Sequence, residues 1–128
     1  MDWRIELEGD GRLIRITTNG PLQLRQQQQM FEELGGHPAF SPGLAVLFDN
    51  RRIDLNGSNV QVIRQSVEIV QEFIRTQQIE RLAGLVDSGF NFGVGRQFEL
   101  LTDAAGGRGF RLFKDEQLAL RWLRGDSL

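Results

Sequence analysis

Few residues of this chain have the type and spacing that catalysis requires. The sole histidine, His37, lies between Gly36 and Pro38, with no serine or acid at motif spacing to serve as a nucleophile or an orienting partner. The chain has no cysteine, which excludes a thiolate nucleophile and leaves only an all-carboxylate metal site. The acid pairs Glu32-Glu33 and Asp115-Glu116 are typical of a solvated helix face and of a first helical turn. We therefore expect no catalytic residue, no metal site and no cofactor.

A glycine-rich segment, Gly93-Val94-Gly95-Arg96-Gln97-Phe98, has part of the spacing of a dinucleotide-binding loop. It follows a predicted strand and opens a predicted helix, as such a loop requires. However, Phe98 stands at the place of the third glycine, and the turn that follows Val86 is longer than the fingerprint allows. The alternative is that these glycines let a helix begin close to the sheet, with Phe90 and Phe92 filling the edge of the core. We expect no bound nucleotide.

The most informative segment runs from Val46 to Ser58. A buried strand is predicted to end at Asp49, a short loop carries Asp54, and a helix is predicted to begin at Asn56 or Ser58. The carboxyl edge of an open α/β sheet collects ligands, because free N–H groups and the helix dipole there favour anions. We expect the Ser58 hydroxyl to cap the helix. The predicted interaction loop consists of Asp49, Asp54, Asn56, Gly57 and Ser58.

The elements that position this loop are predicted from hydrophobic patterning. Apolar and polar residues alternate over 3–7 and 14–18, with turn residues between them, which predicts an N-terminal β-hairpin. Continuous apolar runs over 44–48 and 82–86 are typical of central strands, and residues 109–113 predict one more. Helical patterns, the first opened by Pro21 and the last capped by Asp115, cover 21–36, 58–76, 92–105 and 115–124. The order β-β-α-β-α-β-α-β-α predicts an α/β fold with a mixed sheet.

The predicted helix over 58–76 has an unusually wide apolar face. Its apolar side chains, which include Val60, Val67 and Phe73, cover about half of the cylinder, whereas a single packing contact needs an arc of roughly 100°. Something besides the sheet must cover the flank of this helix. A neighbouring helix of the same chain, a homodimer interface and a lipid-like ligand are the three explanations.

Length and charge limit the classes of function. The chain has 128 residues, which suits a single domain over 1–128. Its net charge of −2 argues against nucleic-acid binding, which depends on a basic surface. No apolar run approaches the roughly 20 residues of a membrane span, and the N-terminus lacks a signal-peptide pattern. We therefore expect a soluble cytoplasmic protein.

The chain resembles the SpoIIAA-like proteins, small bacterial domains related to STAS domains and to the SEC14 lipid-binding fold. The order of strands, the apolar strand before Asp49, and the segment from Phe110 to Glu116 with Ala119 and Trp122-Leu123 carry the resemblance over nearly the whole chain. It implies a SpoIIAA-like, or STAS-like, mixed sheet. It also implies a function in regulation or protein interaction.

The resemblance does not extend to phosphorylation. In the anti-sigma factor antagonists of the STAS group, the loop before the equivalent helix has the four residues aspartate, serine, then serine or threonine, then glycine. Phosphorylation of the hydroxyl at the third place breaks binding to a kinase. The corresponding segment here is Asp54-Leu55-Asn56-Gly57. Asn56 has no hydroxyl, so the switch cannot operate at that place. The alternative acceptor is Ser58, two residues on, at the predicted helix start, where negative charge is favourable.

Three functions remain as hypotheses. We favour a non-enzymatic regulatory or protein-interaction module that binds a protein partner through the loop from Asp49 to Ser58 and the wide apolar helix that follows it. The alternative is a carrier or sensor of a small apolar, lipid-like ligand, suggested by the wide apolar helix face and the SEC14 relationship. The third, a hydrolase that uses Asp49 and Asp54, has no motif in its support, and we expect the protein not to be an enzyme.

Overall fold

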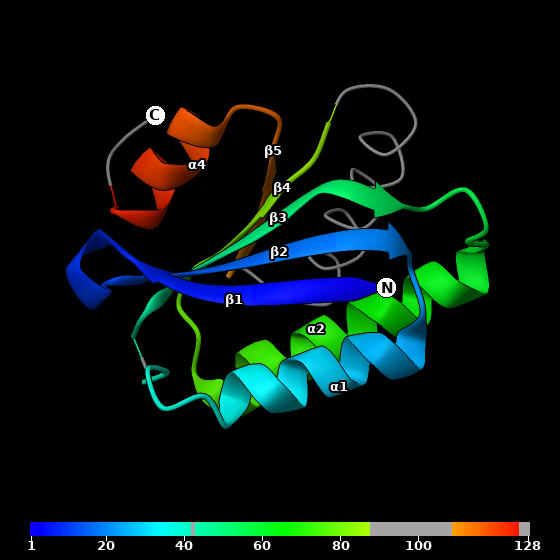
Figure 1. Cartoon of the computed structure of the whole chain (residues 1–128), viewed down its shortest axis with the longest axis horizontal. Helices are drawn as coiled ribbons and strands as arrows, with labels where there is room; N and C mark the ends of the chain where they lie inside the picture. Colours follow the sequence, from blue (N-terminus) through cyan, green and yellow to red (C-terminus); the bar gives the residue numbers. More distant parts are fainter. Residues whose placement is uncertain (42, 88–108, 126–128) are drawn as a thin grey trace.

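The chain forms a mixed five-stranded sheet with helices on both faces (Figure 1). This structure, a computed structural model, describes residues 1–41, 43–87 and 109–125. The strands follow one another across the sheet in chain order: β1 (Asp2–Glu8), β2 (Leu13–Pro21), β3 (Ala45–Asp54), β4 (Leu82–Leu85) and β5 (Phe110–Phe113). β1 and β2 pair antiparallel, and every later pair is parallel. The predicted mixed α/β sheet with an N-terminal hairpin is therefore confirmed.

The helices divide between the two faces of the sheet. α1 (Leu24–Gly35) and α2 (Val60–Gln77) lie side by side on one face, and α4 (Glu116–Leu123) lies on the other (Figure 1). The predicted helix over 92–105 and the glycine-rich segment that opens it lie outside the described residues. No helix among the described residues is both long enough and apolar enough to cross a membrane.

The main core lies between the sheet and the α1–α2 layer. The Phe31 ring on α1 lies 5.4 Å from the Phe48 ring on β3 and 4.6 Å from the Phe73 ring on α2, measured between ring centroids. The wide apolar face of α2 is thus covered by α1 as well as by the sheet, which is the first of the three explanations. Among the larger side chains of the apolar face, Val60 remains 64% exposed.

A smaller core lies on the α4 face. Ala119 and Leu123 of α4 pack against Leu47 and Leu85 of the sheet. The Arg81 guanidinium, just before β4, lies over the Trp122 ring at 5.3 Å and donates a hydrogen bond to the Trp122 carbonyl. Asp115 caps α4 as predicted, because its Oδ1 accepts from the Leu118 amide at 3.1 Å.

β3 is longer than predicted and contains a β-bulge. The register against β2 shifts by one residue between the Thr17–Asp49 pair and the Asn19–Arg52 pair. Such an extra residue reverses the alternation of side chains, so Ile53 turns into the core beneath α2. The expectation that the strand ends at Asp49 is wrong, because pairing with β2 resumes after the bulge and continues to Asp54.

Two helix starts also differ from the prediction. β2 continues through Pro21, which pairs with Asp54, and α1 begins at Leu24 instead of in the turn of Pro21. α2 begins at Val60, with Asn59 as its N-cap. In both cases the strand before the helix is extended by pairing with its neighbour in the sheet, and this long-range pairing has no local sequence signal.

Candidate functional site

The five residues of the predicted interaction loop do not form one cluster. Asp49 lies within β3 and faces α4, and its residue surface is only 8% exposed. Asp54 ends β3, and Asn56, Gly57 and Ser58 follow it in the turn toward α2. Asp49 and Asp54 thus belong to different surroundings, separated by the bulge.

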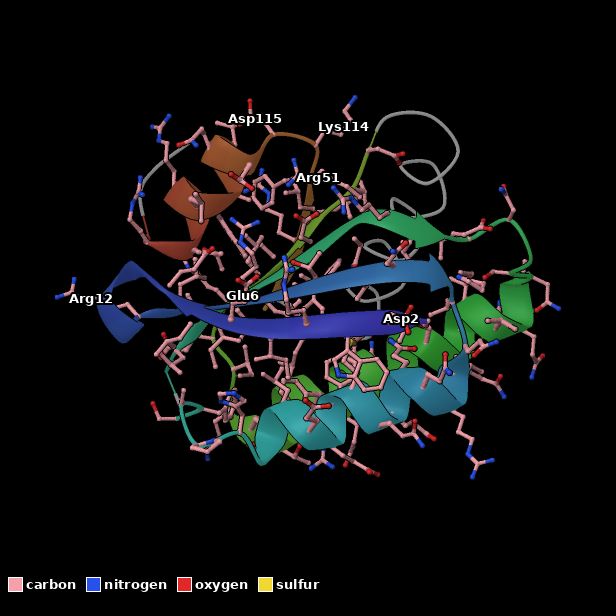
Figure 2. All side chains as sticks on the ribbon, in the orientation of Figure 1. Asp2, Glu6, Arg12, Arg51, Lys114 and Asp115 are labelled. Atoms are coloured by element: carbon pink, nitrogen blue, oxygen red, sulfur yellow. The ribbon has the colours of Figure 1, made fainter. Side chains whose placement is uncertain are left out.

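Two arginines hold the Asp49 carboxylate. Arg51 donates through Nε to Oδ1 at 2.9 Å and through Nη2 to Oδ2 at 2.7 Å, and Arg15 Nη1 lies 3.3 Å from Oδ2. Burial opposes ionisation of Asp49, but the hydrogen bonds and charge of Arg51, with the charge of Arg15, outweigh it and lower its pKa. Figure 2 shows Arg51 on the same side of the sheet as α4. A carboxylate with a lowered pKa and two bound arginines is a poor general base.

Arg15 extends this contact into a charge cluster that joins β1, β2, β3 and α4. Its Nε donates to both oxygens of Glu8, at 3.0 and 3.1 Å, and its Nη1 lies 3.0 Å from Glu116 Oε1. Glu116 also contacts Arg51 Nη2 at 3.4 Å. These contacts pair three carboxylates with two guanidinium groups and hold the first turn of α4 against the sheet. The five residues of this charge cluster are Glu8, Arg15, Asp49, Arg51 and Glu116.

The segment from Asp54 to Ser58, the turn loop, is held by its own hydrogen bonds. Asp54 Oδ1 accepts from the Asn56 amide at 2.9 Å, and the Ser58 amide donates to the Leu55 carbonyl at 3.0 Å. Asn59 Oδ1 accepts from the Val62 amide at 2.9 Å and caps α2. The expectation that Ser58 caps this helix is therefore wrong. Asparagine is as strong a cap as serine, so the sequence did contain the correct signal one residue later.

The turn loop presents polar groups to solvent. Asp54, Asn56 and Gly57 are exposed, Ser58 is half-buried, and Val60 adds an exposed apolar side chain at the first residue of α2. Four of the five predicted residues therefore lie on one continuous surface segment, and Asp49 does not belong to it.

A cavity of about 90 Å³ lies behind the turn loop, between the sheet and the α1–α2 layer. Ile53 and Leu55, on either side of Asp54, contribute to its wall. Most of the lining is apolar, but four polar side chains also line it. Ser66 Oγ donates to Gln27 Oε1 at 2.9 Å, and Thr18 Oγ1 donates to Asn50 Oδ1 at 2.6 Å. Sequence reasoning missed this cavity, because its lining comes from segments that no local pattern connects.

Other predicted features have simple structural roles. His37 Nδ1 accepts from the Ala39 amide at 3.1 Å, so this histidine stabilises a turn. Among residues 1–41, 43–87 and 109–125, no group of three or more acids and histidines is arranged to hold a metal ion.

The strand order also removes the crevice in which many open α/β sheets bind ligands. That crevice forms where the order of strands reverses and helices leave to opposite faces. Across the described sheet each strand lies beside the preceding one, so the order does not reverse. The described sheet therefore has no crevice of this kind.

Comparison with known proteins identifies the fold. No protein-family model matches the sequence, and no curated protein matches it. Among solved structures, the chain is similar to an uncharacterized protein of the DUF3478 family from Shewanella loihica PV-4, described as having a SpoIIAA-like fold. The match has a TM-score of 0.56 and 19% identity, over 95% of this chain and 92% of that one. The fold is SpoIIAA-like. At this identity, the match to the SpoIIAA-like protein shows the fold alone.

Proposed function

We propose that this SpoIIAA-like domain is a non-enzymatic protein-interaction module, and that the turn loop together with Val60 forms its contact surface. The observation that carries the proposal is a loop that is both exposed and internally hydrogen-bonded. A loop already held in one conformation loses less entropy on binding than a flexible one. Val60 supplies apolar area beside the polar groups of the turn, as protein interfaces commonly do.

A non-enzymatic role is supported by the state of the two candidate acids. Asp49 is bound by two arginines on the α4 face. Asp54 accepts a backbone hydrogen bond within the turn. Neither arrangement resembles a base beside a nucleophile.

Affinity capture from the organism that encodes the chain tests this proposal. Asn56→Glu adds one negative charge to the turn loop, and Gln29→Glu adds the same charge to the exposed face of α1 as a matched control. We expect a partner that the wild type and the control retain and the loop variant loses, confirmed by calorimetry with the purified partner. A partner set that is the same for all three proteins would exclude the turn loop as the contact surface.

A second candidate function is the binding of a small apolar ligand, and the cavity behind the turn loop favours it. Its volume of about 90 Å³ is enough for several water molecules or a short aliphatic group, and most of its wall is apolar. Val70, which lines the cavity and is 5% exposed, allows a direct test. We expect short-chain fatty acids, whose aliphatic part this volume can hold, to raise the melting temperature of the wild type but not of Val70→Phe. An equal effect on both proteins, or none on the wild type, would count against this function.

A further inference from the structure

β1 is an edge strand with a sequence that complements itself. The sheet order gives it one neighbour, β2, among the described strands. Edge strands present unpaired backbone N–H and C=O groups that readily pair with another strand. We propose that two copies of the chain pair β1 with β1, antiparallel, about a two-fold axis at Ile5.

The hydrogen bonds of β2 determine which backbone groups of β1 point outward. The Ala45 amide in β3 donates to the carbonyl of Arg12, the residue just before β2, at 3.3 Å. In this parallel ladder the backbone N–H and C=O groups of the even-numbered residues of β2 therefore point toward β3. Odd-numbered residues of β2 therefore face β1, where they pair with its even-numbered residues. The N–H and C=O groups of Trp3, Ile5 and Leu7 consequently point away from the sheet.

An antiparallel pair centred on Ile5 uses all of these outward groups. Ile5 lies opposite Ile5 of the second copy, and each Trp3 lies opposite Leu7, so all three residues of each strand exchange backbone hydrogen bonds. The same register places each Arg4 opposite Glu6 of the second copy. In one copy these two side chains already form an exposed ion pair at 2.9 Å, so both stand on the same face of the strand and reach the seam together.

Charge selects this register from its neighbours. Sliding one strand by two residues in one direction, the smallest slip that keeps the outward backbone groups paired, places Arg4 opposite Arg4. Sliding it by two residues in the other direction places Glu6 opposite Glu6. Like charges directly opposite one another are destabilising. At the ends of the proposed seam Asp2 faces Glu8, but the Glu8 carboxylate is already bound by Arg15 at 3.0 and 3.1 Å.

The opposite face of the seam covers an exposed apolar side chain. Leu7 is 48% exposed in one copy. The Trp3 ring stands on the same face and is fixed by a hydrogen bond from its Nε1 to Glu33 on α1, at 2.9 Å. In the dimer each Leu7 lies beside a Trp3 of the second copy, and both side chains lose contact with water.

Exchange of the two charges tests the seam on the full chain. By sedimentation velocity we expect the wild type to dimerise reversibly with concentration, because one strand from each copy buries less than the roughly 1,600 Å² of a standard interface. Arg4→Glu and Glu6→Arg each place like charges opposite one another at two positions, and we expect each variant alone to be monomeric. Mixed together, the two variants have opposite charges across the seam and form a mixed dimer, which native mass spectrometry identifies by mass.

Arg12→Glu is the matched control, since it makes the same charge change on an exposed arginine at the end of the hairpin that points away from the β1 edge (Figure 2). We expect this control to dimerise as the wild type does. A wild type that stays monomeric, or variants and control that dimerise alike, would overturn the proposal.

Hydrogen exchange gives a second readout that does not depend on the stability of the variants. In the wild type, the amides of Trp3, Ile5 and Leu7 should exchange more slowly as concentration rises, while exchange at the α4 amides stays constant. Protection of α2 or α4 in place of β1 would assign the contact to another surface and reject the seam.

Discussion

Two adjacent polar residues, Ser58 and Asn59, precede α2, but only Asn59 is its N-cap. Asn59 accepts from the Val62 amide, and the Ser58 hydroxyl takes no part in that bond. Loss of an N-cap typically costs about 1 kcal/mol. We therefore expect Asn59→Ala to lower the free energy of unfolding by about that amount, and Ser58→Ala to change it by less than about 0.5 kcal/mol. Urea denaturation measures both, and the reverse ranking would return the cap to Ser58.

The charge of Asp49 should make the free energy of unfolding depend on pH in the acid range. Arg51 and Arg15 lower its pKa in the folded state below the ordinary value, so its stabilising contribution is present above about pH 4 and is lost as the pH falls through the folded-state pKa. Asp49→Asn should cost about 1–3 kcal/mol at pH 7, because two arginines lose a charged partner. The difference from the wild type should shrink toward pH 2.

The pH dependence of unfolding by urea, measured between pH 7 and pH 2, checks this expectation. Asp87→Asn, at an exposed carboxylate after β4, is the control for a general effect of losing one charge. A penalty for Asp49→Asn that is the same at every pH would show that its charge does not contribute.

At the scale of elements, contact between α1 and α2 depends on an aromatic pair. The Phe31 and Phe73 rings are buried and lie 4.6 Å apart. We expect Phe31→Ala and Phe73→Ala each to cost about 3–5 kcal/mol. The double variant should cost less than the sum, with a coupling of about 0.5–1.5 kcal/mol, because the rings stabilise one another. A double-mutant cycle by chemical denaturation measures the coupling, and strict additivity would mean that the two helices pack independently.

Elements with a local signal could be predicted from the sequence, and those set by distant contacts could not. The alternation around Ile5 and Ile16 identified the hairpin, and Asp115 marked the start of α4. The bulge after Asp49 has no local pattern, because it arises from pairing between strands. For the same reason the sequence predicted the exposed turn loop but not the charge cluster, whose Arg15 and Glu116 lie 101 residues apart.

The two tryptophans of the chain make it possible to measure whether the two faces of the sheet unfold cooperatively. Trp3 packs against the α1–α2 core, and Trp122 packs against the α4 core on the opposite face of the sheet. Both layers share the same strands, so we expect them to unfold together. Fluorescence of Trp3→Phe, which reports the α4 layer, and of Trp122→Phe, which reports the other, should give the same urea midpoint. An earlier transition at Trp122 would show that α4 detaches as a separate unit.

The order of the strands has a consequence for synthesis. Leu13 pairs with Ala45, Val46 with Leu82, and Leu82 with Phe110, so each strand joins the one completed before it. A nascent chain that leaves the ribosome N-terminus first can therefore add strands one by one at the growing edge, without waiting for a later strand to be inserted between earlier ones. The β1 edge is complete from the first hairpin onward. On a polysome, where neighbouring nascent chains display that same edge, it would be available for pairing before either chain is finished.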